Sequence, residues 1–139
     1  MKQFLKQFFL FIIGGIIYGM IEIAFRGNTH WTMLIVGGLC FTGIGLLNEY
    51  PRFRPNLLTQ AVLGMIIITT LEFISGVVIN IILGWNVWDY SGLPLNILGQ
   101  ICLPFCFAWL GLSVVAIFVD DGLRYLIFKE PLPKYKIFK

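Results

Sequence analysis

Hydrophobic residues occur in four long runs, separated by short segments of polar and turn-forming residues. The runs cover about Phe4 to Phe25, Trp31 to Asn48, Leu57 to Leu83, and Leu95 to Val119. Each has at least about 18 residues, which is the length a helix needs to cross the hydrocarbon of a bilayer. Helices are expected because hydrocarbon offers no water to hydrogen-bond an exposed backbone. The pattern therefore predicts an all-α, polytopic membrane protein with a bundle of four transmembrane helices.

The fourth run and the end of the chain carry further local signals. Pro104 lies inside the run and is expected to kink its helix, and Asn96 is placed to cap the start of that helix. Residues 1–119 would form the transmembrane domain. Residues 120–139 would form a basic, amphipathic tail on the cytoplasmic membrane surface, with Pro131 and Pro133 preventing one continuous helix.

The two halves of the chain share a faint pattern. Glu22 precedes Gly37-Gly38-Leu39-Cys40 in the first pair of runs, and Glu72 precedes Gly99-Gln100-Ile101-Cys102 in the second. A duplication would give two parallel helical hairpins related by an axis along the membrane normal. Chance likeness between glycine-rich apolar helices is the alternative.

Composition excludes several classes of protein. Hydrophobic residues make up 58% of the 139 residues and charged residues only 12%, and the mean hydropathy is +0.88. A soluble domain carries about 25% charged residues. A soluble enzyme, a disordered chain and a nucleic-acid-binding protein are all disfavoured. The expected partner is the lipid bilayer.

The basic residues predict the orientation in the membrane. With both termini inside, Arg26 alone lies outside, and nine basic residues lie on the cytoplasmic side. Those nine are Lys2, Lys6, Arg52, Arg54, Arg124, Lys129, Lys134, Lys136 and Lys139. Lysine and arginine concentrate on the cytoplasmic side of membrane proteins. We therefore expect a multi-pass protein of the cell membrane with both termini cytoplasmic.

Two carboxylates interrupt the apolar runs and are the most informative polar residues. An ionisable group inside the bilayer costs at least about 2.5 kcal/mol. Glu22 continues the face formed by Gly15 and Gly19, a small-xxx-small pair that lets another helix approach closely. Glu72 belongs to a polar stripe that faces a partner helix or a wet cavity and is formed by Thr69, Glu72, Gly76 and Asn80.

In the predicted topology several polar residues fall in the outer half of the membrane, where carboxylates could hold a cation, share a proton or receive a cationic ligand. The candidate ion- or substrate-binding residues are Glu22, Glu72, Asp89, Asn96, Asn80 and Thr69. The candidate helix-packing positions are Gly15, Gly19, Gly76 and Gly99.

Each of these interpretations has a structural alternative. Glu22 and Glu72 could be protonated or hydrogen-bonded groups that only hold helices together. Asp89 could cap a turn with Ser91, and His30 could be a solvated loop residue.

The sequence carries no signature of catalysis or of a cofactor. Cys40, Cys102 and Cys106 lie in apolar runs without a Cys-x-x-Cys motif, so buried thiols are expected rather than a metal or redox site. The phosphate-binding loop, the Gly-x-Ser-x-Gly motif and the His-Glu-x-x-His motif are absent. We expect no catalytic residue, no metal and no enzyme activity.

Three segments share features with a known family. The stretch Val-Trp-Asp-Tyr-Ser-Gly-Leu-Pro-Leu-Asn-Ile-Leu-Gly-Gln-Ile-Cys at 87–102 resembles the signature of the putative ABC-transporter type IV permease family. Tyr18-Gly19-x-x-Glu22 with Arg26-Gly27 resembles its first helix. Asp-Asp-Gly-Leu-Arg-Tyr at 120–125 and Pro-Lys-Tyr-Lys at 133–136 resemble its ending. The resemblance implies a membrane subunit that works with a separate ATPase subunit, and Glu22, Asp89 and Asn96 match the family's recurring polar positions.

Three functions remain as hypotheses. The first is a transporter or channel component that acts as a homo-oligomer or with another membrane protein, since four helices are few for a translocation path. It predicts an outer cavity lined by Glu22 and Glu72 and closed by the loop from Gly84 to Pro94, which is rich in Trp and Tyr. The second is a structural or regulatory protein that binds another membrane protein or lipid, with a dry packed core. The third is a phage-type membrane-permeabilising protein, suggested by small size and basic tail.

Overall fold

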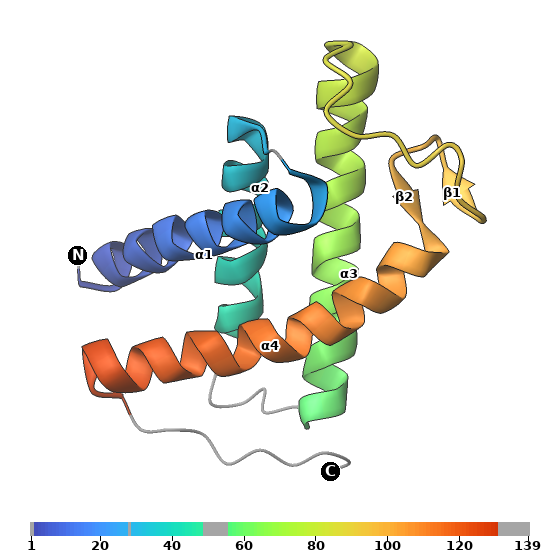
Figure 1. Cartoon of the computed structure of the whole chain (residues 1–139). Helices are drawn as coiled ribbons and strands as arrows, with labels where there is room; N and C mark the ends of the chain where they lie inside the picture. Colours follow the sequence, from blue (N-terminus) through green and yellow to red (C-terminus); the bar gives the residue numbers. More distant parts are fainter. Residues whose placement is uncertain (1, 28, 49–55, 131–139) are drawn as a thin grey trace.

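The computed structural model describes residues 2–27, 29–48 and 56–130, and its architecture is helical (Figure 1). The main elements are α1 (Lys2–Arg26), α2 (Trp31–Gly45), α3 (Leu57–Gly76) and α4 (Leu103–Phe128). A 3-10 turn, Leu46–Asn48, extends α2, and a π-helical segment, Val77–Ile82, extends α3. Before α4 the chain forms a small antiparallel hairpin of β1 (Asn96–Ile97) and β2 (Ile101–Cys102). The predicted all-α membrane fold with four helices is confirmed.

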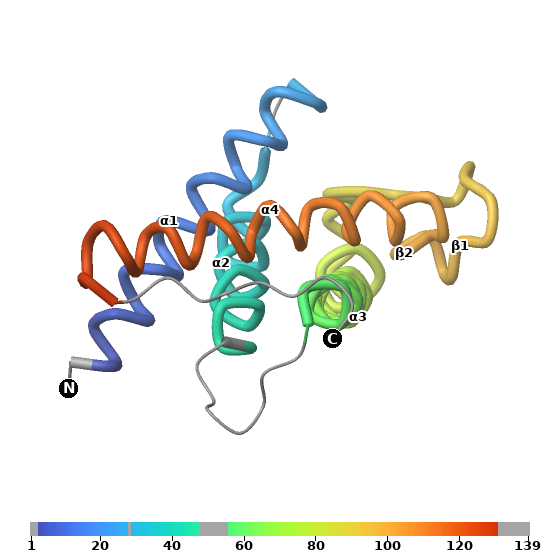
Figure 2. Tube along the Cα trace, turned by 90° about the horizontal axis from the view of Figure 1, so that it is seen from below, coloured from blue at the N-terminus to red at the C-terminus, as the bar shows by residue number. Residues whose placement is uncertain are grey.

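The helices cross at different inclinations. α2 and α3 run side by side in opposite directions, and α1 and α4 lie crosswise to them (Figures 1 and 2). The start of α1 lies beside the end of α4, where Lys6 pairs with Glu130 and the ring of Phe9 meets that of Phe128 edge-on at 5.8 Å between centroids. We call this the terminal end of the molecule. The opposite end, where α1 meets residues 84–102, is the loop end.

The outside of the bundle is as apolar as its inside. α1 exposes large hydrophobic side chains along one face, namely Phe4, Phe8, Ile12, Ile16, Met20 and Ile23. Three helices in the described part of the chain are long and apolar enough to cross a membrane, and α2 is a shorter apolar helix of 15 residues. The start of α1 lies beside the end of α4, so these two points are on the same side of the membrane. The chain between them must then cross an even number of times. If α1, α3 and α4 span the membrane, α2 must span it too.

Glycine allows α1 and α2 to approach closely. A Cβ added at Gly15 would lie 2.5 Å from the carbonyl oxygen of Leu34, and one added at Gly38 would lie 2.6 Å from that of Phe11. A Cβ added at Gly19 would collide with the side chain of Leu34. Backbones in direct contact gain dispersion energy that does not depend on excluding water, as helix association in lipid requires.

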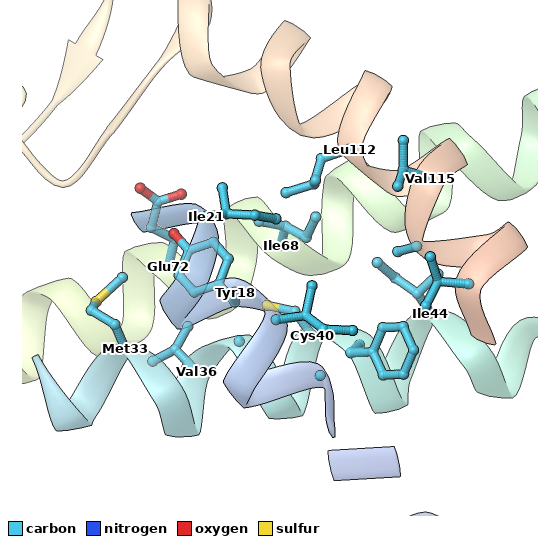
Figure 3. Close-up of a pocket in the computed structure, with 16 residues that line it drawn as sticks. Tyr18, Ile21, Met33, Val36, Cys40, Ile44, Ile68, Glu72, Leu112 and Val115 are labelled. Atoms are coloured by element: carbon cyan, nitrogen blue, oxygen red, sulfur yellow. The ribbon is translucent and has the colours of Figure 1, made fainter. Parts of the chain in front are cut away.

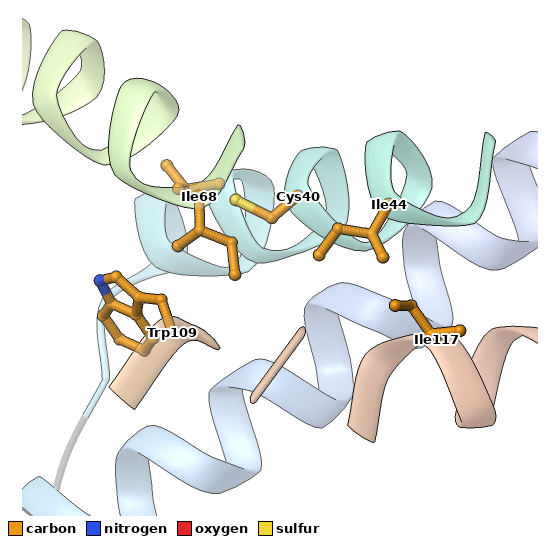
Figure 4. Packing of buried hydrophobic residues seen from close by; sticks show 6 residues of the cluster. Cys40, Ile44, Ile68, Trp109 and Ile117 are labelled. Atoms are coloured by element: carbon orange, nitrogen blue, oxygen red, sulfur yellow. The ribbon is translucent and has the colours of Figure 1, made fainter. Parts of the chain in front are cut away.

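Two apolar clusters hold the helices together. The larger joins α2, α3 and α4 through Val36, Cys40, Ile44, Ile68, Trp109 and Ile117 (Figure 4). The smaller lies at the loop end and consists of Met33, Ile79 and Trp88. Trp88 comes from the loop, so the loop is packed onto the helices rather than projecting from them.

The structure corrects the expected fourth helix. α4 begins at Leu103 rather than Leu95, and Asn96 lies in β1 instead of capping α4. Pro104 therefore occupies the first turn of the helix, where the missing amide hydrogen removes no helical hydrogen bond, and it causes no kink. Residues 120–128 continue α4 and are not part of a tail, since the helix ends only at Lys129, which adopts a left-handed conformation. The second loop with Arg52 and Arg54, and the remaining tail from Pro131, lie outside the described residues.

The segments that suggested an internal repeat have different structures. Gly37 to Cys40 lies within α2, whereas Gly99 to Cys102 forms a turn and β2. The shared letters therefore do not correspond to shared local structure.

Candidate functional site

A cavity of about 80 Å³ lies where all four helices meet (Figure 3). Its walls are mostly aliphatic, with contributions from Ile17, Ile21, Val36, Ile44, Ile68 and Leu112. Tyr18 and Glu72 bring oxygen atoms to the lining, and Figure 3 shows the Tyr18 hydroxyl and the Glu72 carboxyl close together at one end. The cavity is thus an apolar chamber with an acidic end.

Glu72 is a buried acid on α3, with only 4% of its surface exposed. The side chains of Tyr90 and Trp109 hydrogen-bond its carboxyl group. Burial and the Glu72 charge raise the pKa of Tyr90 above its usual value. The hydroxyl therefore stays protonated and donates the hydrogen bond to the Glu72 carboxyl. The other carboxyl oxygen, Oε2, has no hydrogen-bond partner among the described residues. Glu72 also forms no ion pair with a basic side chain among the described residues.

Glu22 is equally buried but has a cationic partner. Its Oε2 lies 3.3 Å from Nη1 of Arg26, one helical turn further along α1. The Tyr18 hydroxyl also hydrogen-bonds Glu22, and an electrostatic interaction links Glu22 with Glu72. The structure thus places the two carboxylates near each other, but of the two only Glu72 lines the cavity, whereas the sequence predicted a lining by both. We call Tyr18, Glu22, Glu72, Tyr90 and Trp109 the loop-end site.

Residues 84–102 form a covering loop over this site. Asn80, at the end of α3, anchors the loop: its Oδ1 accepts from the backbone amide of Val87 at 2.7 Å, and its Nδ2 donates to Gln100 Oε1 at 2.7 Å. The indole of Trp88 donates to the Gln100 carbonyl at 3.1 Å. Gly76 leaves room for the loop, since an added Cβ would lie 2.5 Å from Gln100 Oε1.

Arg26 ties the covering loop to α1. Its Nη2 donates to the carbonyl oxygen of Val87 at 2.7 Å, while its Nη1 faces Glu22. One side chain thus contacts both the loop and a carboxylate of the loop-end site. Displacing the loop would break this contact.

Asp89 and Asn96 shape the loop itself. Asp89 Oδ1 accepts from the amide of Ser91 at 2.9 Å and also from its hydroxyl, and these bonds lower the pKa of Asp89. Asn96 Nδ2 donates to the Leu93 carbonyl at 2.8 Å, and Asn96 Oδ1 accepts from the amide of Gly99 at 3.2 Å. Gly99 has a φ of +71° beside Asp89, a conformation suited to glycine. The described hydrogen bonds and ion pairs do not join Asp89 or Asn96 to Glu22 or Glu72.

The remaining candidates occupy separate positions. Thr69 Oγ1 lies 3.7 Å from Cys106 Sγ at the α3–α4 contact, so the polar stripe on α3 faces α4 and the covering loop. His30 caps α2 by accepting from the amide of Thr32 at 3.3 Å, and its ring lies 5.8 Å from that of Trp85. Within the described residues, no three His, Cys, Asp or Glu side chains are grouped to hold a metal ion.

A second buried polar cluster at the terminal end was not expected from the sequence. Asp120, Asp121 and Arg124 on α4 are 0%, 4% and 3% exposed, and we call them the arginine cluster. Arg124 Nε donates to Asp120 Oδ2 at 2.9 Å, and Nη1 lies 3.8 Å from Glu130 Oε1. The i,i+4 spacing of Asp120 and Arg124 is typical of an ion pair on a helix but does not indicate that the pair is buried. The one sequence feature that relates to this burial is Gly45, whose missing side chain lets α2 pass directly over Asp120.

The partners of the carboxylates at the loop end were also missed. Tyr90 and Trp109 are far from Glu72 in the sequence, and no local pattern joins them. Tyr18 precedes Glu22 by one helical turn, so the spacing alone indicates that the two side chains share a face of α1.

Comparison with known proteins gives one result. A family model described as "Putative ABC-transporter type IV" matches residues 1–132, the family that the sequence motifs resemble. The match includes both the loop-end site and the arginine cluster. No curated protein and no solved structure matches the chain.

Proposed function

The chain belongs to the putative ABC-transporter type IV family, and from this membership we propose that it is a membrane subunit of a transport system whose ligand site is the loop-end site. The ligand would bind at Glu72 and Glu22 and extend into the cavity. The covering loop would close the site from outside the cell.

The observation that carries the proposal is the state of Glu72. A carboxyl in a membrane interior is costly, and such residues commonly mark a pathway for an ion, a proton or a substrate. Glu72 is 4% exposed and borders a cavity, and its Oε2 lacks a hydrogen-bond partner among the described residues. A purely structural carboxyl is expected to have both oxygens satisfied.

The covering loop suits the role of a gate. It rests on the helices through the anchor at Asn80 and through the link from Arg26 to Val87. Tyr90 of the same loop hydrogen-bonds Glu72, so the loop position and the carboxyl are coupled. A ligand that replaced the Tyr90 hydroxyl at Glu72 would weaken the attachment of the loop.

Transport would require further subunits. The chain has four helices, and the family's name implies an association with an ATPase. We propose that the chain assembles with itself or another membrane protein and receives energy from a separate ATPase. From the distribution of basic residues we propose that both termini, and therefore the terminal end, lie on the cytoplasmic side.

The test is ligand-dependent stability of the purified protein in detergent. A ligand present at 100 times its Kd raises the unfolding free energy by about 2.7 kcal/mol. Parent and Glu72→Gln would be heated with a panel of inorganic cations, organic cations and pH values. We expect at least one ligand to stabilise the parent and not the variant, while Glu130→Gln, at the terminal end, responds like the parent.

A structural role is the second candidate, favoured by the hydrogen bonds from Tyr90 and Trp109 to Glu72. It predicts that parent and Glu72→Gln respond identically to every cation of the panel at each pH. That outcome would refute the ligand-site proposal.

A further inference from the structure

We propose that the loop-end site binds a lipophilic organic cation, with an ammonium head at Glu72 and a short apolar tail in the cavity. This inference rests on the proposed function, in that it takes the loop-end site as a ligand site. It adds the chemical class of the ligand.

The charge of the site selects a cation. Glu72 and Glu22 are 4% and 6% exposed and share one electrostatic environment. Arg26 lies against Glu22, and the described basic side chains leave Glu72 without an ion pair. A single positive charge at Glu72 would balance the pair, and its Oε2 has no hydrogen-bond partner among the described residues that the cation would have to displace.

The rings around the carboxyl favour an organic head group over a bare metal ion. Tyr18, Tyr90 and Trp109 surround Glu72, and the rings of Tyr18 and Trp109 lie 6.4 Å apart between centroids. Aromatic faces attract quaternary ammonium groups, which need no hydrogen-bond acceptors. A metal ion such as calcium takes six to eight oxygen ligands. The described residues hold no group of three acidic, histidine or cysteine side chains that could begin such a shell.

The walls of the cavity favour a ligand with an apolar tail. Apart from Tyr18, Glu72 and the thiol of Cys40, the lining consists of aliphatic side chains, Met33, Phe41 and glycines. Each methylene transferred from water into such surroundings raises affinity by about fourfold. A volume of about 80 Å³ admits a short tail and not a long one.

The position of the cavity also suits a ligand that dissolves in lipid. Val115 lines the cavity, yet it is 54% exposed on the outer face of α4. The chamber is therefore one side chain away from the lipid-facing surface. A lipophilic cation could reach Glu72 from the bilayer without crossing the covering loop.

The experiment measures binding of butyl- and hexyltrimethylammonium to the purified, full-length protein in a nonionic detergent, by equilibrium dialysis. In the parent, hexyltrimethylammonium should bind about 15-fold more tightly than the butyl compound, because it buries two more methylenes. Hexyl sulfate, of the same tail and opposite charge, should show no saturable binding. Glu72→Gln should weaken binding of both cations at least tenfold, and Glu130→Gln should leave it unchanged.

A second variant keeps the test decisive if Glu72→Gln does not fold. Ala116→Leu fills part of the cavity without altering the carboxylates, and it should abolish the preference for hexyl over butyl. Equal binding of the cations by parent and Glu72→Gln, or equal binding of hexyl sulfate by the parent, would overturn the inference. Inorganic cations that stabilise the parent through Glu72, with no binding of either alkylammonium, would overturn this inference and leave the proposed function standing.

Discussion

Carboxylates are buried at both ends of the helical bundle, but their positive partners lie at different depths. At the terminal end, the side chains of Arg124 and Asp120 are 4% and 1% exposed and lie 2.9 Å apart. At the loop end, the side chain of Arg26 is 41% exposed and meets Glu22 at 3.3 Å, while Glu72 lies deeper beside the cavity.

The difference separates two uses of buried charge. Both ion pairs join residues one turn apart on a single helix, but in the arginine cluster the positive charge is sealed inside, which is the arrangement of a permanent structural element. At the loop-end site the positive charge is that of the partly exposed Arg26, which pairs with Glu22 but not with Glu72. Positive charge is therefore in shorter supply at the loop end, and a ligand could provide it.

The largest expected effect concerns which end faces which side of the membrane. A reporter that is active only in the cytoplasm, fused after Lys139, should be fully active, and one inserted at Gly92 in the covering loop should be inactive. The nine-to-one distribution of basic residues is the physical reason. An active reporter at Gly92 would invert the orientation and place the loop-end site on the inside.

The next effect is the loss of the sealed arginine. Arg124→Met leaves buried carboxylates without their arginine and should lower the unfolding free energy by about 3–5 kcal/mol. Arg26→Met is the matched control at the loop end and should cost about 1 kcal/mol or less, because its pair is partly exposed. Unfolding of both variants in mixed detergent gives the values. Equal losses would remove the distinction between the two ends.

The anchor of the covering loop should be of intermediate importance. Asn80→Ala deprives the Val87 amide and Gln100 Oε1 of their partner and should cost about 1–3 kcal/mol. Thr69→Val, on the same face of α3, loses only a weak contact with a sulfur atom and should cost less. Thermal unfolding in detergent measures both. A larger loss for Thr69→Val would show that the loop contributes little to stability.

Without ligand, Glu72→Gln should fold at least as stably as the parent. The amide can still accept from Tyr90 and Trp109, and it avoids the cost of a buried charge. This is the reverse of the result expected for Arg124→Met, measured in the same unfolding experiment. A loss of several kcal/mol would instead make Glu72 a structural residue like Asp120.

The smallest effect is the pH response of Asp89. Its pKa is lowered by the bonds from Ser91, so its contribution to stability is present above the unfolded pKa, near 3.9, and is lost as the pH falls through the folded value. The carboxyl is solvent-exposed, so the change should be slight. Asp89→Asn should flatten the pH dependence of unfolding between about pH 5 and 2 relative to the parent. An identical slope in the variant would contradict the assignment.

Much of the fold can be predicted from the length of the apolar runs. The prediction fails between Leu95 and Cys102. α1, α2 with its 3-10 turn and α3 with its π-helical segment begin and end within a few residues of their expected bounds, because lipid demands uninterrupted apolar helices. The stretch from Leu95 to Cys102 is apolar as well, yet it folds as a hairpin. Its shape depends on hydrogen bonds to Asn80 and Trp88, which are distant contacts that apolarity does not encode.

Only part of the candidate site could be predicted from the sequence, because its other residues come together through distant contacts. Glu22 and Glu72 were identifiable because a carboxyl in an apolar run is costly wherever the helices pack. The aromatic partners of Glu72 and the burial of Arg124 depend on how α4 and the covering loop cross the other helices. Asp89 and Asn96 were recognisable as polar positions, but only the folded loop shows that their side chains bond to their own turn.

The shortness of α2 has a consequence for how it crosses the membrane. Its 15 residues span about 22 Å, against about 30 Å for the hydrocarbon of a typical bilayer. The following 3-10 turn adds only about 6 Å. Together the helix and its turn span about 28 Å, close to the hydrocarbon thickness. Of the four helices, α2 therefore has the least length to spare for a tilted crossing, and it is one of the helices that wall the cavity.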